Sequence, residues 1–227
     1  MTHVNLDSMI HKYKAIFFDF DGVIVDSVSV KTAAFSKLFE KYGETIVNQV
    51  ISYHLANGGI NRIDKFKYYY KELLQLQLDE KELSLLCKQF SEIVVDKIIH
   101  SKEIEGAEIF LKKNYLKINC FVVSATPVEE LIEIIKGRNI RKYFKEIRGT
   151  PFSKTSHIKK LLLKYQLNSN TACFIGDAVE DYHAARECGL DFFGIISGTE
   201  STLFKLYPEI KWSSNFKTHP FIASLIS

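Results

Sequence analysis

Cysteine is scarce in this sequence, and neither a long apolar run nor a block of basic residues is present. The four cysteines lie far apart among 227 residues, at Cys87, Cys120, Cys173 and Cys188, and form neither a CxxC pair nor a cluster with histidine. Such spacing gives no indication of a zinc site. Because Cys120 and Cys173 lie inside apolar runs, we expect buried, reduced thiols and a cytoplasmic protein.

Membrane and nucleic-acid partners are not expected from this composition. No uninterrupted apolar stretch approaches membrane-spanning length, and residues 1–14 lack the apolar core that a signal peptide needs. The formal net charge is only +3, and the lysines are spread along the chain instead of forming a basic block. With 46% hydrophobic and 25% charged residues, the chain is typical of a soluble globular protein. The sequence gives no indication of the oligomeric state.

The most informative stretch is an apolar run that ends in two carboxylates. Ala15 to Phe18 is short and apolar, which favours a strand buried on both faces, and Asp19, Asp21 and Gly22 follow it. Side chains two positions apart on an extended chain point the same way, and open α/β sheets bind ligands at the carboxyl ends of their strands. The pattern therefore predicts two carboxylates at a ligand-binding edge, although Asp-Gly is also a common turn dipeptide.

Residues 28–100 carry only helical patterns. Apolar positions recur at helical spacing in four segments, and nothing in this stretch is typical of a strand. The four segments are residues 29–42, 46–55, 60–76 and 79–99. Four helices of this kind are consistent with a small bundle.

From residue 106 onward, strand and helix patterns alternate. Strands are predicted at residues 118–123, 144–148, 171–175 and 191–196, and helices at residues 107–114, 127–137, 153–165 and after Asp177. Such alternation predicts right-handed βαβ units, a parallel sheet and an α/β fold. We expect Thr126 to cap the helix that begins at Pro127. An edge strand near Ile210 and a terminal helix complete the prediction.

The helical stretch is thus an insertion after the first strand. We expect a discontinuous α/β core of residues 1–27 and 101–227 and a helical domain of residues 28–100, because a structureless loop of that length is implausible. The chain then crosses between the two parts at Ser27 and at residues 100–103.

Polar residues follow the other predicted strands as well. Ser124 precedes a helix N-terminus, whose free N–H groups bind anions such as phosphate. Lys154 lies in the first turn of its helix, where the dipole disfavours a cation, and a residue that breaks a local rule is a candidate functional residue. Each also has an ordinary interpretation, Ser124 as a helix cap and Lys154 as a surface lysine.

The fourth strand end carries Asp177 and Asp181, four positions apart on one face of the first turn of a helix. Asp177 as an N-cap with Glu180 in a capping box is an alternative interpretation. Taken together, the strand ends supply carboxylates for a hard cation such as Mg²⁺, and a lysine and a hydroxyl for phosphate oxygens.

These residues carry a resemblance to a known family. Asp19-Phe20-Asp21-Gly22-Val23-Ile24-Val25-Asp26-Ser27, followed in order by Ser124, Lys154 and Gly176-Asp177-x-x-x-Asp181, resembles the four motifs of the haloacid dehalogenase (HAD) superfamily of phosphohydrolases. Order and placement at strand ends match over essentially the whole chain. The resemblance implies a Rossmann-like core with helices on both faces and an all-helical cap inserted after the first motif.

The resemblance also implies a reaction. Asp19 is the nucleophile that forms an aspartyl-phosphate, and Asp21 is the general acid and then the base. Ser124 and Lys154 hold the transferring phosphoryl group. Dehalogenases proper lack the second aspartate, so Asp21 argues for phosphate chemistry. A phosphatase of a small phosphorylated metabolite, such as a sugar phosphate, is the function implied.

Mg²⁺ is the cofactor that the resemblance implies. Asp19, Asp177 and the backbone carbonyl of Asp21 are expected to bind it, and Asp181 is expected to be a further ligand or to support one.

Within the superfamily, the chain is most similar to phosphoglycolate phosphatases and β-phosphoglucomutases. Their first cap helix often carries a histidine where this sequence has Lys31, which weakens the mutase interpretation. Residues 57–62 resemble the substrate-specificity loop of the cap. There, Gly58 and Gly59 let the backbone approach a ligand, and Arg62 is expected to bind a second anionic group. A plain turn with a surface arginine is the alternative.

Three other functions stay open at this point. A phosphosugar mutase would exclude water and return the phosphoryl group to its substrate. A phosphonatase would need a Schiff-base lysine from the cap, for which Lys31 is a weak candidate. A non-catalytic binding module with the same fold is the third.

Overall fold

A six-stranded parallel sheet forms the centre of the protein, in a computed structural model that describes residues 13–218. The strands are β1 (Ala15–Phe18), β2 (Asn119–Pro127), β3 (Glu146–Thr150), β4 (Ala172–Gly176), β5 (Asp191–Ile195) and β6 (Lys211–Ser213). Their order in the sheet is β3-β2-β1-β4-β5-β6. The order reverses beside β1, and ligands of open α/β sheets bind at such a switch point.

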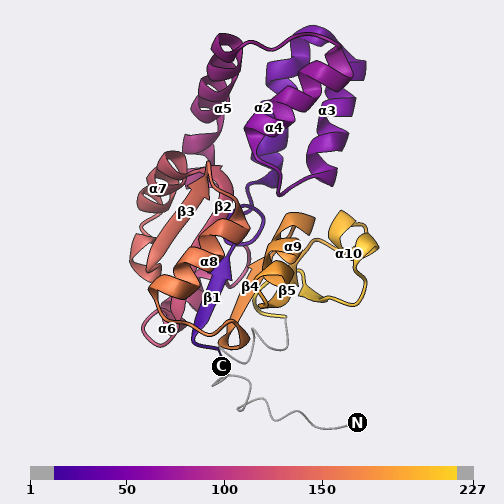
Figure 1. The fold of residues 1–227 in the computed structure, drawn as a ribbon. Helices are drawn as coiled ribbons and strands as arrows, with labels where there is room; N and C mark the ends of the chain where they lie inside the picture. The colour runs from indigo at the N-terminus through magenta and orange to yellow at the C-terminus, as the bar shows by residue number, and fades with distance from the viewer. Residues whose placement is uncertain (1–12, 219–227) are drawn as a thin grey trace.

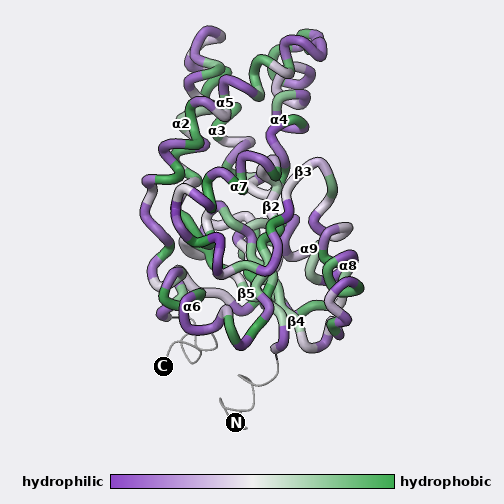
Figure 2. The backbone as a smooth tube through the Cα atoms, turned by 90° about the vertical axis from the view of Figure 1, so that its left-hand side faces the viewer, coloured by the Kyte–Doolittle hydropathy of each residue, from purple (hydrophilic) through white to green (hydrophobic). Residues whose placement is uncertain are grey.

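Both faces of the sheet are buried, as the apolar run of β1 predicts. Ile16 and Phe18 pack on one face with Phe110, whereas Ala15 and Phe17 pack on the other. Figure 2 shows the strands between α6 (Ala107–Asn114) on one side and α8 (Lys154–Lys164) and α9 (Val179–Glu187) on the other. The α/β fold and its parallel sheet are therefore confirmed.

Further helices complete the core around the sheet. They are α7 (Val128–Gly137), α10 (Thr202–Leu206) and the short 3₁₀ turns at Arg141–Tyr143 and Ser169–Thr171. Helix α7 covers the same face as α6, because Leu131, Ile134 and Ile135 join the apolar cluster around Phe18. No helix of the described residues is both long and apolar enough to cross a bilayer.

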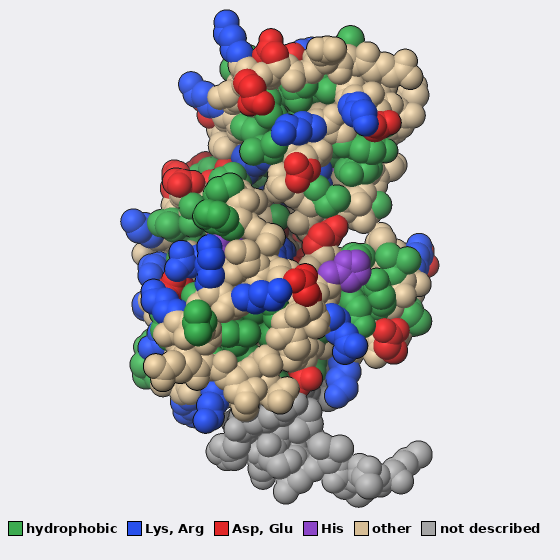
Figure 3. Space-filling view, viewed as in Figure 1, with side chains coloured by type: hydrophobic (Ala, Val, Ile, Leu, Met, Phe, Trp, Pro, Cys, Tyr) green, Lys and Arg blue, Asp and Glu red, His purple; other side chains and the backbone are tan. Residues whose placement is uncertain are grey.

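The insertion after β1 is entirely helical, and we call it the helical block (residues 28–100). It contains α2 (Val28–Phe39), a 3₁₀ turn (Glu40–Tyr42), α3 (Glu44–Ala56), α4 (Arg62–Tyr68), the π-helix η2 (Tyr69–Leu74) and α5 (Glu80–His100). Aromatic rings fill its interior, where Phe35 packs against Phe66, Tyr69 and Phe90. Figures 1 and 3 show the block stacked on the core across a narrower waist.

The two chain crossings between the block and the core are tied to each other. Val25 forms an antiparallel bridge with Glu103, and the N–H of Asp26 donates to the carbonyl of Lys102. From the core, the guanidinium of Arg138 donates to three carbonyls at the end of α5, those of Ile98, Ile99 and Ser101. The crossings therefore form one short, paired connection.

Several predicted element boundaries were wrong. The helix expected at residues 60–76 begins at Arg62 and changes at Tyr69 into a π-helix. Thr126 is not the cap of α7: β2 continues to Pro127, which precedes the first helical residue, and the Thr126 hydroxyl bonds Asp21 instead. The edge strand near Ile210 is present as β6, and the terminal helix lies outside the described residues.

Candidate active site

The carboxyl ends of three neighbouring strands bring Asp19, Ser124 and Asp177 to one edge of the sheet. Phe18 of β1 is aligned with Val122 of β2 and with Ile175 of β4, so the residues that follow these positions reach the same level. A cavity of about 1040 Å³ opens at this edge, between the core and the helical block. Asp19, Asp21, Ser124 and Asp177 line it together with residues of α2, α3 and α4.

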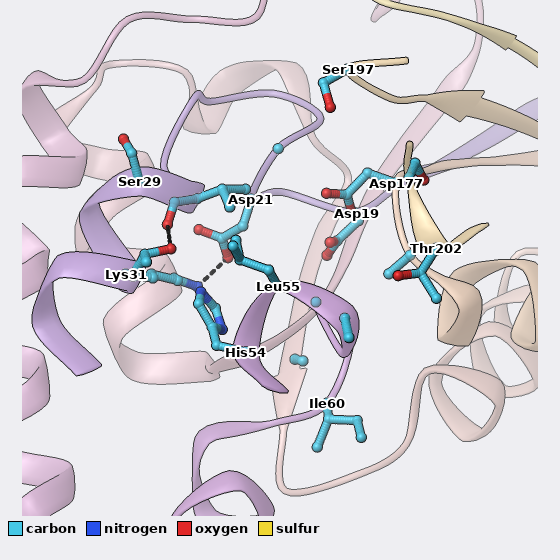
Figure 4. Close-up of a pocket in the computed structure, with 18 of the residues that line it drawn as sticks. Asp19, Asp21, Ser29, Lys31, His54, Leu55, Ile60, Asp177, Ser197 and Thr202 are labelled. Atoms are coloured by element: carbon cyan, nitrogen blue, oxygen red, sulfur yellow. Dashed lines mark hydrogen bonds and ion pairs between the residues drawn. The ribbon is translucent and has the colours of Figure 1, made fainter. Parts of the chain in front are cut away.

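Three carboxylates meet at this edge. One oxygen each from Asp19, Asp177 and Asp181 lies within 4.8 Å of the others. Gly22 permits this approach, because its φ of +75° is rarely adopted by other residues and a Cβ there would lie 3.1 Å from Cγ of Asp177. Figure 4 shows Asp19 and Asp177 side by side and Asp21 turned away from them.

Asp181 uses both of its oxygens within the protein. Oδ1 accepts a 2.5 Å hydrogen bond from the Lys154 ammonium, and Oδ2 accepts the N–H groups of Asp177 and Ala178. The structure therefore places Asp181 where it holds the Asp177 loop and Lys154 in position. It replaces the expected capping box, in which Asp177 was the alternative N-cap.

Asp19 and Asp177 lack enough positive charge around them. The Lys154 ammonium lies 3.2 Å from Oδ1 of Asp19, yet that oxygen has no hydrogen-bond partner among the residues that the structure describes. Burial first, and then Asp181 and Asp21 against the opposing effect of Lys154, raise the pKa of Asp19 to about 7. Burial and Asp19 likewise raise the pKa of Asp177 well above its usual range. Carboxylate oxygens that lack nearby positive charge are suitable ligands for a hard divalent cation.

Asp21 has a different environment, although it is only two residues from Asp19. Its Oδ2 accepts from the Lys31 ammonium at 2.5 Å and from the Thr126 hydroxyl at 2.9 Å, and its Oδ1 accepts from Ser27 at 2.6 Å. Burial opposes the charged form, but these donors outweigh it and lower the pKa of Asp21. Two neighbouring carboxylates thus have pKa values shifted in opposite directions, which is typical of acid–base sites.

The two residues expected to hold phosphate are both buried beside this cluster. Ser124 is 2% exposed and lines the cavity, with its Oγ accepting the N–H of Thr126 at 3.2 Å. Lys154 is 8% exposed, which excludes the surface-lysine interpretation. Burial lowers the pKa of Lys154, but the carboxylates of Asp181 and Asp19 outweigh it and raise the pKa above its usual value, so the side chain is a permanent cation.

The glycines of the loop at residues 57–62 pack against the core. A Cβ at Gly58 would lie 3.8 Å from Cβ of Ala178, whereas a Cβ at Gly59 would lie 2.8 Å from Cβ of Glu180. Position 59 therefore requires a glycine, because the Glu180 side chain leaves no space for a Cβ there. The loop thus rests on the residues that follow Asp177.

Arg62 lies in a different environment from the one expected of an anion-binding residue. Its guanidinium pairs with Oε1 of Glu130 at 2.5 Å, donates to Ser91 at 2.8 Å and lies 4.5 Å over the ring of Phe90. Both partners of the ion pair are 6% exposed. Because Glu130 belongs to α7, the pair joins the helical block to the core instead of presenting a free cation.

Sequence patterns did not reveal two donors to Asp21. Thr126 was expected only as a cap, and Lys31 only as a departure from the usual histidine and as a weak Schiff-base candidate. The signal that was available is spacing: Lys31 begins the second turn of the helix that follows Ser27, so its side chain returns toward the strand end.

Comparisons with known proteins agree with this geometry. The family model described as haloacid dehalogenase-like hydrolase matches residues 16–195. A predicted phosphoglycolate phosphatase from Haemophilus somnus shares the fold with a TM-score of 0.71 at 18% identity, over 89% of this chain and 94% of that one. A Bacteroides vulgatus protein assigned as a β-phosphoglucomutase gives a TM-score of 0.71 at 15% identity, over 97% and 96%.

A HAD hydrolase from Bacillus subtilis has a TM-score of 0.62 at 18% identity, over 81% of this chain and 88% of that one. No match was found among curated proteins. The family model covers well over half of the chain, from β1 to the end of β5. The chain therefore belongs to the haloacid dehalogenase-like hydrolase family.

Proposed function

We propose that the protein is a Mg²⁺-dependent phosphatase that hydrolyses a small phosphorylated metabolite through an aspartyl-phosphate. The observation that carries this proposal is the convergence of Asp19, Asp177 and Asp181 within 4.8 Å, beside an Asp21 that is held separately. Family membership supports a hydrolase, and the likeness to a predicted phosphoglycolate phosphatase supports phosphate esters as substrates.

Asp19 and Asp177 are the side chains that would hold Mg²⁺, with Asp181 supporting Asp177. The carboxyl oxygen of Asp19 that has no hydrogen-bond partner among the described residues, and the raised pKa values of both carboxylates, support a missing positive charge at this point. When bound, Mg²⁺ supplies charge neutralisation for the phosphoryl oxygens. The Bacillus subtilis relative is itself described as bound to magnesium.

In the first step, a carboxylate oxygen of Asp19 attacks phosphorus. The P–O bond to the leaving group breaks as the new P–O bond to Asp19 forms, and the departing alkoxide takes a proton from Asp21. Ser124 and Lys154 would hold the transferring group, because both lie at the strand ends beside Asp19.

In the second step, Asp21 acts as a carboxylate. It takes a proton from a water molecule, whose oxygen attacks phosphorus and breaks the bond to Asp19, so that phosphate leaves and Asp19 is restored. The donors on Asp21 suit this step, because Lys31, Ser27 and Thr126 favour its ionised form. Lys31 is paired with Asp21, so it offers no support for the phosphonatase alternative.

The proposal is tested with Asp19→Asn. This substitution keeps the shape of the side chain and removes the nucleophile, so release of phosphate from a generic phosphomonoester should fall about a thousandfold or more. Asp96→Asn, on an aspartate whose side chain is 86% exposed, is the matched control. Both variants should keep the melting temperature within a few degrees of the wild type.

Chelation by EDTA should likewise stop turnover, and added Mg²⁺ should restore it. Full activity of Asp19→Asn, or full activity in EDTA, would contradict the proposed mechanism. Product analysis separates the phosphosugar mutase, since a mutase would release an isomeric sugar phosphate instead of free phosphate.

A further inference from the structure

The wall of the cavity that faces the catalytic aspartates belongs to the helical block and is basic. Lys31 of α2, His54 of α3 and Arg62 and Lys65 of α4 all line it. Figure 4 shows the His54 ring beside the Lys31–Asp21 pair, across the cavity from Asp177. A substrate whose phosphoryl group lies on Asp19 therefore extends toward this wall.

Most positive charge on this wall is already neutralised by a carboxylate. Lys31 pairs with Asp21 at 2.5 Å, and Arg62 pairs with Glu130 at 2.5 Å. Lys65 is different: within residues 13–218, no carboxylate lies at ion-pair distance from its ammonium. Lysines are almost never fully buried unless they are paired.

Lys65 is nevertheless buried. It is 2% exposed, and its Nζ contacts Nδ1 of His54 at 2.8 Å and lies 5.7 Å above the ring of Phe35. An ammonium has three N–H donors, and this geometry uses one of them. His54 is itself 4% exposed, and its Nε2 has no hydrogen-bond partner of ordinary geometry in the described part of the chain.

The electrostatics of the pair agree with a missing anion. Burial first, and then the neighbouring Lys31, lower the pKa of Lys65 to about 7, although Glu180, Asp177 and Asp21 act in the opposite direction. Burial and Lys65 lower the pKa of His54 to about 3. A purely structural cluster of this kind is destabilising, whereas an anion from a ligand would satisfy it.

We propose that Lys65, oriented by His54, binds a second anionic group of the substrate, a carboxylate or a second phosphate, at the end remote from the scissile phosphoryl group. This inference rests on the proposed phosphatase function and adds the substrate class. It also moves recognition from Arg62, which is committed to Glu130, to a lysine one turn further along α4.

The test compares substrates that differ by one anionic group. The matched pairs are 3-phosphoglycerate with glycerol 3-phosphate, 6-phosphogluconate with glucitol 6-phosphate, and fructose 1,6-bisphosphate with fructose 6-phosphate. Wild-type kcat/KM should favour the more anionic member of at least one pair by about tenfold or more, the value of a charge-assisted contact. The first two pairs identify a carboxylate, and the third identifies a second phosphate.

In Lys65→Met, this preference should fall to about one, through KM and not through kcat. Lys67→Met, an exposed lysine on the same helix, is the matched control and should keep the wild-type preference. A wild type without preference in all three pairs, or a Lys65→Met variant that retains it, would overturn the proposal.

A binding measurement keeps this inference separate from the proposed reaction. Calorimetry with Asp19→Asn, which cannot form the phosphoryl intermediate, should give tighter binding of the more anionic compound, and Asp19→Asn/Lys65→Met should not. If the wild type hydrolyses none of these esters but this selectivity is present, the proposed function fails and anion recognition by Lys65 stands. If hydrolysis occurs but binding is not selective, only the inference about Lys65 fails.

Discussion

The two walls of the cavity have opposite charge imbalances. At the sheet edge, Asp19 and Asp177 lie together with too little positive charge, and their pKa values are raised. On the helical block, Lys65 and His54 lie together with no carboxylate partner among residues 13–218, and their pKa values are lowered. Where the walls meet, Lys31 and Asp21 neutralise each other. Each wall therefore lacks what a metal-bound phosphorylated anion would supply, and the four predictions below test that difference.

Of these four, the largest effect is expected for Lys154→Met, which removes the cation of the acidic wall. The Lys154 ammonium lies 2.5 Å from Asp181 and 3.2 Å from Asp19, so its loss leaves buried carboxylates uncompensated. We expect kcat/KM to fall about a hundredfold or more and stability to fall by about 3–5 kcal/mol. Urea unfolding and steady-state kinetics measure the two effects.

Lys159→Met on the same helix is the control for this change, because Lys159 forms an exposed pair with Glu187. Added Mg²⁺ should recover part of the stability that Lys154→Met loses, since a bound cation opposes the same repulsion. A variant as stable as the wild type in EDTA would show that the acidic wall is not short of positive charge.

Arg62→Met should have the next largest effect, and this effect should not depend on the substrate. Removing the guanidinium leaves Glu130 buried and unpaired, which costs about 3 kcal/mol or more. Arg62→Met/Glu130→Met should recover much of this loss, because both charges are then absent. Kinetics on the matched substrate pairs give the contrast: a selective loss for the more anionic compounds would return Arg62 to anion recognition and weaken the role of Lys65.

Gly59→Ala tests the contact between the block and the residues that follow Asp177. The new Cβ would lie 2.8 Å from Cβ of Glu180, so either the loop or α9 must move, at a cost of about 1–3 kcal/mol. We expect KM to rise severalfold. Gly58→Ala, whose Cβ would be 3.8 Å from Ala178, is the adjacent control and should leave KM within a factor of about two. Equal behaviour of the two variants would show that the close approach of Gly59 to Glu180 has no effect on substrate binding.

The smallest effect concerns pH and His54. The folded protein holds His54 neutral with a pKa of about 3, against 6.5 for an unperturbed histidine, so the unfolded chain binds more protons between these values. The contribution of His54 to stability should therefore fall as pH falls, by about 1 kcal/mol between pH 6.5 and 5.5. Asp19 has the opposite sign, because its pKa is raised from 3.8 to about 7 and stability without Mg²⁺ should fall as pH rises through that window.

Urea unfolding across this pH range, with and without Mg²⁺, separates the contributions of the two walls to stability. His54→Phe should not show the loss of stability that His54 causes as pH falls. Mg²⁺ should suppress the loss of stability that Asp19 causes as pH rises. A wild type and His54→Phe with the same slope at low pH would mean that His54 is charged in the folded protein.

The strand ends could be predicted from the sequence because their information is local. An apolar run that ends in Asp19 fixes both the buried strand and the position of the carboxylate, and the same holds for Asp177 after β4. The alternation of strands and helices then dictates a parallel sheet, which brings these ends together.

The contacts that cross the waist could not be predicted in this way. Arg62 and Glu130 are 68 positions apart, and their pairing depends on the angle at which the block packs on α7. Lys65 of α4 and His54 of α3 lie on different helices, and they meet only because of the path that the chain takes through the loop that contains Gly59. The π-helix after Tyr68 has no clear periodic signal, since its apolar positions also satisfy an α-helix. Domain boundaries and the roles of individual site residues stay predictions until the variants above are measured.

The paired connection between Val25 and Glu103 has a consequence for how such a protein diversifies. The chain leaves the sheet and returns to it at adjacent points. The segment between these points can therefore change in length without moving the two parts of the core apart. Insertions, deletions or an exchange of the whole intervening segment would leave strand order and register untouched. Selection can therefore rewrite most of the helical block while the strand ends that carry Asp19, Ser124 and Asp177 stay in place.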